Sequence, residues 1–387
     1  MMTNEPIAFI DLAAQRQRLG KDIDAAILRV VDHGGYIMGP EVKTLEDQLS
    51  AFCGAKHVIS CANGTDALGL VLLAKEVGPG DAIFCPTFTF AATAEVVAWL
   101  GATPIFVDCL ADTFNMDPAS LEAAIKVANK RGLRPTAVIP VDLFGQPADY
   151  DTIEPICARE GLWILSDAAQ SFGATYRGRK IGSIGLATTT SFFPAKPLGC
   201  YGDGGAIFTD DGELAAIMRS LRVHGQGTDK YDNVRIGING RLDTIQAAVL
   251  IEKLKVFKDE IAARDRVAAR YNKLLSDSAI VPTMLEGATS VWAQYTLRLP
   301  GFDRSAFLAS LKAAGVPTAV YYPRPLHQQT AYKEYPIAGN GLPISERLAA
   351  EVVSLPMHPY LDEATQDRIV DAVKGALTAQ RRRAAAE

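Results

Sequence analysis

Residues 190–206 read TSFFPAKPLGCYGDGGA, and the rest of the chain is interpreted outward from this stretch. Its one lysine, Lys196, lies between Pro194 and Pro197, and several glycines follow. The prolines stiffen the backbone and the glycines permit tight turns, so the amine is held in place. A partly desolvated amine loses its proton more readily, and the neutral form can attack a carbonyl to give a Schiff base. Lys196 is therefore a candidate for the lysine that carries pyridoxal phosphate, with an ordinary loop lysine as the alternative.

Composition sets the broad class of the protein. The 387 residues are 48% hydrophobic, enough for one large and one smaller core, and we predict domains at 1–255 and 256–387. The net charge of −5 gives no reason to expect nucleic acid or an anionic membrane surface. Six cysteines without a C-x-x-C pair predict small buried side chains in a reducing compartment and no metal site. No segment approaches the roughly 18 apolar residues of a membrane span, so we expect a cytoplasmic protein.

Apolar runs and helical patterns alternate along the first two thirds of the chain. After helices at 11–32 and from Glu41, strands are expected at 57–61, 82–85, 104–107, 137–141, 162–166, 188–193 and 206–208, mostly with helices between them. This alternation predicts an α/β fold with a mostly parallel sheet, in which ligands bind at the carboxyl ends of the strands. A long helical stretch from Arg241 is expected to lead into a smaller α+β domain.

Two strand ends offer groups for a phosphate and a flat ring. Gly64 and Thr65 begin a helix after the first strand, where free N–H groups and the helix dipole favour a phosphate, although an ordinary helix cap is the alternative. No G-x-G-x-x-G follows, which disfavours a dinucleotide. Phe88 and Phe90 follow the second strand, where an aromatic side chain could cover one face of a flat cofactor ring. The alternative is that both are core, and for one of them we favour this.

Further polar groups fall at later strand ends. Asp167 follows an apolar run, and its carboxylate could keep a pyridine nitrogen protonated; a helix N-cap is the alternative. Gln170 could reach the phenolic oxygen of the ring, and the Ser191 hydroxyl could serve the phosphate. A phosphate turn, an aromatic ring, an acid and Lys196 thus occur in order, which favours a pyridoxal-phosphate enzyme.

Five segments carry a family resemblance. The motifs NGTDAL, DAAQSFGA, SFFPAKPLGCYGDGGA, NGRLDTIQAA and YYPRPLH are similar to those of the DegT/DnrJ/EryC1/StrS family of sugar aminotransferases, over nearly the whole chain. The resemblance implies the fold type I of pyridoxal-phosphate transferases, with a mostly parallel seven-stranded sheet in the large domain and a smaller α+β C-terminal domain. It also implies an enzyme that transfers the amino group of glutamate to a keto sugar carried on a nucleotide.

The resemblance also implies residue roles. The residues implied to bind the cofactor are Gly64, Thr65, Phe90, Asp167, Gln170, Ser191, Lys196 and Asn239. Of these, Lys196 looks like the catalytic Schiff-base lysine, and Asn239 would reach the phosphate from the other subunit of a homodimer with shared active sites. A cap on the following helix is the alternative for Asn239. One branch of the family has histidine at the lysine position and performs dehydration, and Lys196 disfavours that activity here.

The substrate expectation rests on finer similarities. With MGPEV, HGQG and SLPMHPYL, the chain resembles enzymes that aminate C3 of a UDP-2-acetamido-2-deoxy-3-keto-hexuronic acid for O-antigen precursors. Arg241 is the best-placed partner for the carboxylate of the sugar, and pairing with Asp243 is the alternative. Tyr321, Tyr322 and His327 are expected to line the same pocket, although family members often have His-Tyr-Pro where this chain has Tyr-Tyr-Pro.

Other functions are compatible with the same fold. The alternatives are an aminotransferase for a nucleotide-linked 3-keto or 4-keto-6-deoxy sugar, a pyridoxal-phosphate dehydratase or lyase, and a cofactor-free regulatory or binding protein. The full set of ring contacts disfavours the last of these.

Overall fold

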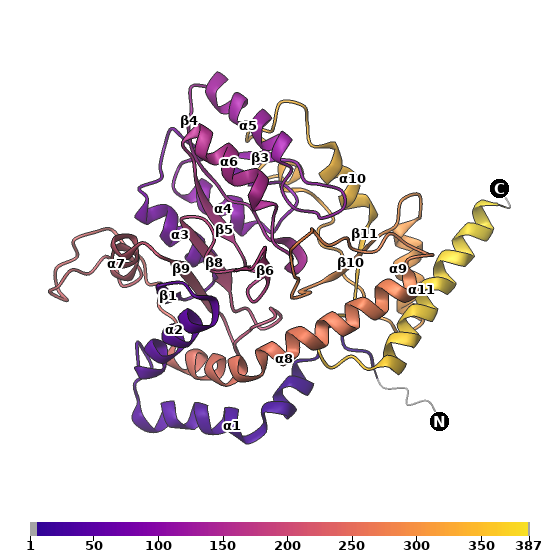
Figure 1. Cartoon of the computed structure of the whole chain (residues 1–387), viewed down its shortest axis with the longest axis horizontal. Coiled ribbons are helices and arrows are strands. Elements are labelled where there is room, and N and C mark those ends of the chain that lie inside the picture. The colour runs from indigo at the N-terminus through magenta and orange to yellow at the C-terminus, as the bar shows by residue number, and fades with distance from the viewer. Residues whose placement is uncertain (1–5, 386–387) are drawn as a thin grey trace.

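The computed structural model describes residues 6–385 and is built around a central seven-stranded sheet (Figure 1). The strands lie in the order β1-β9-β8-β5-β4-β2-β3. Their bounds are β1 (His57–Cys61), β2 (Asp81–Pro86), β3 (Thr103–Val107), β4 (Arg134–Val138), β5 (Trp163–Asp167), β8 (Ala187–Ser191) and β9 (Gly205–Thr209). Strand β9 runs antiparallel to both neighbours, and all the other neighbouring pairs are parallel. The predicted α/β class with a mostly parallel seven-stranded sheet is confirmed.

Helices cover both faces of the sheet, which explains why its strands read as apolar runs. In β2, Ile83 and Cys85 face a cluster completed by α3 (Gly64–Ala74) and α7 (Gly212–Leu221). The alternate residues Ala82 and Phe84 face a second cluster, with α5 (Pro118–Lys130) and α6 (Tyr150–Glu160). Successive side chains of a strand point to opposite faces, so this one strand contributes to both cores. A further helix, α4 (Ala92–Trp99), follows β2.

The N-terminal helices pack on a long helix at one side of the molecule (Figure 1). Helices α1 (Leu12–His33) and α2 (Pro40–Cys53) both contact α8 (Thr244–Leu275). The helix predicted at 11–32 is broken at Gly20, whose φ of 50° and ψ of −127° are not helical. Glycine tolerates this conformation, so α1 changes direction there while it follows α8.

A smaller α+β unit follows α8. Strands β10 (Tyr295–Arg298) and β11 (Val352–Leu355) pair antiparallel, and α9 (Arg304–Ala313) and α11 (Glu363–Ala384) pack with them against the second half of α8. Helix α10 (Pro343–Glu351) leads directly into β11. The domain division predicted at residue 255 falls inside α8 and stays a prediction. None of the helices in residues 6–385 combines the length and the apolar character needed to cross a membrane.

One predicted strand is placed wrongly. The strand predicted at 137–141 is β4 at Arg134–Val138, whose register begins with Arg134 opposite Asp81. Pro140 has no N–H to continue the ladder, and the polar start of the strand gave no apolar signal. The remaining elements comprise the short hairpin β6 (Thr175–Tyr176) and β7 (Arg179–Lys180) and the single turns η1 (Leu143–Gly145) and η2 (Leu326–Gln328).

Candidate active site

The start of α3 forms an anion cradle beside the end of β8. The Asn63 side chain accepts a hydrogen bond from the Asp66 N–H at 2.7 Å, so the expected cap is present. Within the described residues, the N–H groups of Gly64 and Thr65 donate to no protein acceptor and remain available. A Cβ on Gly64 would lie 2.7 Å from the Cβ of Ser191, so only glycine lets helix and strand approach this closely. Free N–H groups, a helix dipole and the Ser191 hydroxyl fit a phosphate.

Asp167 ends β5 at the same edge of the sheet. Its side chain is 5% exposed, and Oδ2 accepts a hydrogen bond from the Thr93 hydroxyl at 2.9 Å. Burial raises the pKa of Asp167, while its hydrogen bonds and the nearby Lys196 amine oppose the rise. The alternative of a helix N-cap is wrong, because residues 169–173 form turns and no helix begins there. A buried carboxylate on a strand end fits the nitrogen of a pyridine ring.

Lys196 lies on the loop between β8 and β9, facing the same edge. Its N–H donates to the Phe193 carbonyl at 2.8 Å, and the side chain is half-buried. A Cβ on Gly199 would lie 2.6 Å from the carbonyl oxygens of Phe193 and Pro194, so the loop folds tightly on itself. Burial lowers the pKa of Lys196, and the charge of Asp167 partly offsets this. A lowered pKa leaves more of the amine neutral, as a nucleophilic lysine requires.

Gln170 and the two phenylalanines define a place for a flat ring. Gln170 Oε1 accepts from the Phe144 N–H at 2.8 Å, and its Nε2 donates to the Tyr322 hydroxyl at 3.2 Å. Phe88 is buried in the core, whereas Phe90 is 60% exposed and free to cover a ring. Phe88 is thus the core residue of the two, and the contact of Phe90 with a cofactor ring stays a prediction. These side chains suit the pyridoxal ring.

Tyr322 and His327, which were predicted to line the sugar pocket from the small domain, lie near the end of β2. Tyr322 packs edge-on against Phe88, with ring centroids 6.1 Å apart, and Tyr321 lies 6.5 Å from the Phe9 ring. His327 Nδ1 and the Thr87 hydroxyl are 2.8 Å apart, directly after β2. Tyr322 and His327 are therefore brought to the predicted edge of the sheet, and Tyr321 lies beside Tyr322.

Asn239 and Arg241 line a polar cavity of about 540 Å³ that also includes Asn63. Arg241 Nε donates to Asn239 Oδ1 at 2.9 Å, and among the described residues Arg241 makes no ion pair with Asp243. The residue at the N-cap of α8 is Asp243, so the capping alternative for Asn239 is wrong. Ile37, from the segment between α1 and α2, lines the same cavity and is 47% exposed.

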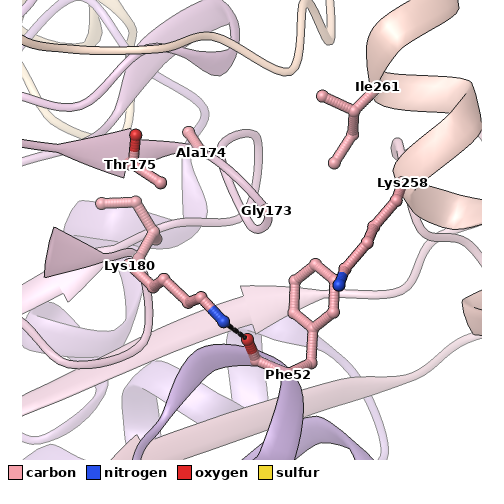
Figure 2. Close-up of a pocket in the computed structure, with 8 residues that line it drawn as sticks. Phe52, Gly173, Ala174, Thr175, Lys180, Lys258 and Ile261 are labelled. Atoms are coloured by element: carbon pink, nitrogen blue, oxygen red, sulfur yellow. Dashed lines mark hydrogen bonds between the residues drawn. The ribbon is translucent and has the colours of Figure 1, made fainter. Parts of the chain in front are cut away.

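Some neighbours of the site gave no sequence signal. The Thr93 hydroxyl donates to Asp167 and the Phe144 N–H donates to Gln170, each from another segment of the chain. No sequence motif marks Thr93 or Phe144. A second surface pocket, shown in Figure 2, shares no residue with this site. There the Lys180 amine donates to the Phe52 carbonyl, and the Lys258 amine lies 6.0 Å from the Phe52 ring centroid.

Comparisons with known proteins identify the family of the chain. The model of the "DegT/DnrJ/EryC1/StrS aminotransferase family" matches residues 17–374. A "UDP-2-acetamido-2-deoxy-3-oxo-D-glucuronate aminotransferase" of Pseudomonas aeruginosa is 52% identical over 93% of this chain and 97% of its own. The crystal structure of a family member from Brucella abortus is 55% identical, with a TM-score of 0.93 over 95% of this chain and 99% of that one.

A more distant structure includes a cofactor. NtdA from Bacillus subtilis, solved "with bound cofactor pmp", is 29% identical, with a TM-score of 0.86 over 97% of this chain and 87% of that one. The family match spans most of the chain, and the similarity in sequence and structure is just as extensive. The chain therefore belongs to the DegT/DnrJ/EryC1/StrS aminotransferase family.

Proposed function

We propose that this protein is a pyridoxal-phosphate aminotransferase that transfers the amino group of glutamate to C3 of a UDP-2-acetamido-2-deoxy-3-keto-hexuronic acid. The observation that carries the proposal is that Lys196 and the buried Asp167 lie close together beside the phosphate cradle formed by Gly64 and Ser191. The pKa of Lys196 is lowered there. The 52% identical relative from Pseudomonas aeruginosa acts on a sugar of this class, which supports the substrate. The product would serve the synthesis of O-antigen precursors in the cytoplasm.

Each residue of the site has a role in this proposal. Pyridoxal phosphate supplies the electron sink through which an amino group is taken up and passed on. The N–H groups of Gly64 and Thr65 and the Ser191 hydroxyl would hold its phosphate. Asp167 would keep the ring nitrogen protonated, and the second Nε2 hydrogen of Gln170 is available to the ring oxygen. Phe90 would cover one face of the ring.

Lys196 would have two tasks. Its neutral amine would be the group that attaches the cofactor covalently. When not attached, the amine would move a proton to or from the reacting carbon of the substrate. The turn around Gly199 keeps the amine within reach in both tasks, because the loop backbone is fixed by its own close contacts.

The carboxylate of the sugar is the feature that separates this substrate from neutral keto sugars. The Arg241 guanidinium could hold it with two parallel hydrogen bonds, and it lines a polar cavity with Asn239. Tyr321, Tyr322 and His327 would line the sugar pocket from the small domain.

A homodimer with shared active sites is part of the proposal. Ile37 is an exposed apolar side chain in the cavity of Asn239, and Ile236, on the preceding loop, is 93% exposed. Apolar side chains on a polar rim are suited to burial against a second copy. In that dimer Asn239 would reach the phosphate held by the partner subunit.

The direct test is glutamate-dependent amination across a panel of nucleotide keto sugars. We expect the highest kcat/KM on the 3-keto uronate. Arg241→Ala should lose roughly 10- to 100-fold on this sugar and much less on a 3-keto sugar without the carboxylate, because a charge-assisted pair is worth about 1.5–3 kcal/mol. Arg131→Ala, at an exposed arginine after α5 and outside the cavity, is the control. Equal losses of Arg241→Ala on both sugars, or a wild type that prefers a 4-keto-6-deoxy sugar, would refute the substrate assignment.

A further inference from the structure

A second carboxylate, Asp142, lies buried beneath the candidate site. It follows β4, and none of its surface is exposed. Oδ1 accepts hydrogen bonds from the Ala148 N–H at 2.9 Å and from the Tyr150 hydroxyl at 2.7 Å. Oδ2 accepts from the Ser171 hydroxyl at 2.8 Å. Asp142 therefore connects the segment before α6 to the turn that follows β5.

The contacts of Asp142 bracket the segment that runs from Asp167, the last residue of β5, to Gln170 on the turn after it. The Asp142 N–H donates to the Asp167 carbonyl at 3.0 Å. Ser171, which bonds the Asp142 carboxylate, directly follows Gln170. On the other side, the Tyr150 hydroxyl that donates to Asp142 is also 2.7 Å from the hydroxyl of Ser166, the residue before Asp167. The network thus contacts this segment at both of its ends, at Ser166 and at Ser171.

The neighbouring backbone also depends on this anchor. Two residues after Asp142, Phe144 has a φ of 60°, which side-chain-bearing residues rarely adopt. In this conformation its N–H reaches Gln170 Oε1 at 2.8 Å. Such backbone strain persists only where the surroundings fix it, and it concentrates at functional sites. Asp142 and the Asn115 side chain, which accepts from the Leu143 N–H at 2.9 Å, fix this segment.

We propose that Asp142 is a positioning residue that fixes Asp167 and Gln170 relative to each other for contact with the cofactor ring. The inference rests on the proposed function, in which both residues touch the ring. A site must hold its contact groups to within about 0.5 Å; Asp167 is held by β5, whereas Gln170 lies on a turn whose irregular backbone cannot do this alone. A fully satisfied buried network supplies the missing rigidity.

Ionisation of the Asp142 carboxyl costs free energy at this buried position. Burial raises the pKa of Asp142 to about 7, and the charge of Asp167 adds to the rise, while three hydrogen bonds oppose it. A carboxyl whose ionisation costs free energy, next to a second acid, is a poor choice for stability alone. Its placement agrees with a role in the geometry of the site.

The test measures uptake of pyridoxal phosphate by full-length apoprotein. The dissociation constant comes from the visible absorbance of the bound cofactor, and borohydride reduction with mass spectrometry reports attachment at Lys196. We expect Asp142→Ala to weaken binding at least about tenfold, since Ser171 and Tyr150 lose the carboxylate to which their hydroxyls donate, while the backbone bond from residue 142 to the Asp167 carbonyl remains. Asp142→Asn keeps an acceptor for Ala148 and Tyr150 and has the same size, so it should recover most of the affinity.

Asp108 provides a matched control. It is also buried and follows a strand, β3, but it accepts from the Ser345 N–H at 2.8 Å and the Ile344 N–H at 3.0 Å and so holds α10. Asp108→Ala should lower the melting temperature and leave the affinity for the cofactor within about twofold, because Asp108 holds no part of the Asp167 turn. If Asp142→Ala does not fold, Ser171→Ala removes one anchor at little volume cost and should still weaken binding several-fold.

The outcomes separate the two proposals. A wild type that takes up no pyridoxal phosphate would overturn both the proposed function and the positioning role. A wild type that binds the cofactor while a folded Asp142→Ala or Ser171→Ala binds it equally well would overturn the positioning role alone. Equal loss of affinity in Asp142→Ala and Asp108→Ala would also overturn it, because a general loss of stability would then account for the effect.

Discussion

Gly64 and Ser191 lie so close that a methyl group on Gly64 would sit 2.7 Å from the Cβ of Ser191. The contact joins the start of α3 to the end of β8, which are far apart in the sequence. The two sides of the proposed phosphate cradle, the start of α3 and the end of β8, can therefore approach each other only because Gly64 has no side chain.

Gly64→Ala should separate the two walls of the cradle. We expect the affinity for pyridoxal phosphate to fall at least about tenfold, since the helix must shift away from Ser191 to relieve the contact. The measurement is a titration of apoprotein followed by visible absorbance. Gly375→Ala is the control: Gly375 lies inside α11 and faces open space where alanine would place its methyl group, so alanine should leave binding unchanged and stabilise the helix by up to about 1 kcal/mol. Unchanged affinity in Gly64→Ala would contradict the cradle.

Shared active sites can be tested by mixing two inactive proteins. Lys196→Ala should fold and remain inactive, because the loss is of chemistry on a loop, and Asn239→Ala should bind the phosphate poorly. After subunit exchange, a mixed dimer contains one site with both wild-type residues, so activity should reappear. Mixing each variant with itself is the control. If the mixture stays inactive although mixed dimers are detected by native mass spectrometry, Asn239 does not act across the interface.

Glu46 and Arg222 form a buried ion pair at 2.6 Å, and Glu46 also accepts from the Ser60 N–H at 2.9 Å. We expect Glu46→Ala to lower the free energy of unfolding by about 3–5 kcal/mol, because it leaves the Arg222 charge buried without its partner. Asp47→Ala breaks the neighbouring Lys43–Asp47 pair, which is exposed, and should cost less than about 1 kcal/mol. Urea unfolding of both variants measures the difference, and similar losses would contradict the prediction.

His358 makes stability depend on pH. Burial lowers its pKa to about 4, whereas an unfolded histidine titrates near 6.5. The unfolded chain therefore binds the proton first, so the contribution of neutral His358 is present above pH 6.5 and is lost as the pH falls towards 4. Linkage gives a loss of about 2 kcal/mol between pH 7 and pH 5. His358→Gln should lose less stability over this interval than the wild type, as measured by urea unfolding; parallel losses would contradict the assignment.

The ends of β1, β2, β3, β5 and β9 could be predicted to within one residue from the apolar runs, whereas β4 and β8 end two or three residues before the predicted positions. Lys196 and Asp167 could be selected as candidates from their own neighbours in the chain, and the structure brings both to the same edge of the sheet. Thr93 could not, since it contacts Asp167 across 74 positions and carries no local signature. The hydrogen bond from the Phe144 N–H to Gln170 could not be predicted either. It is made by a backbone group whose orientation depends on a φ of 60°, and the residue type does not indicate this angle. Phe88 and Phe90 were separated only by their burial in the folded chain.

The antiparallel direction of β9 has a consequence for how the enzyme can change over evolution. A parallel strand after β8 would require the chain to cross the whole sheet before returning, whereas β9 lets it reverse at the same edge. The segment 192–204 that bears Lys196 is thus a local detour between two neighbouring strands. Residues of this segment outside the tight turn at Gly199 can therefore change without altering the order of the strands, so the surroundings of the amine can adapt while the sheet stays constant.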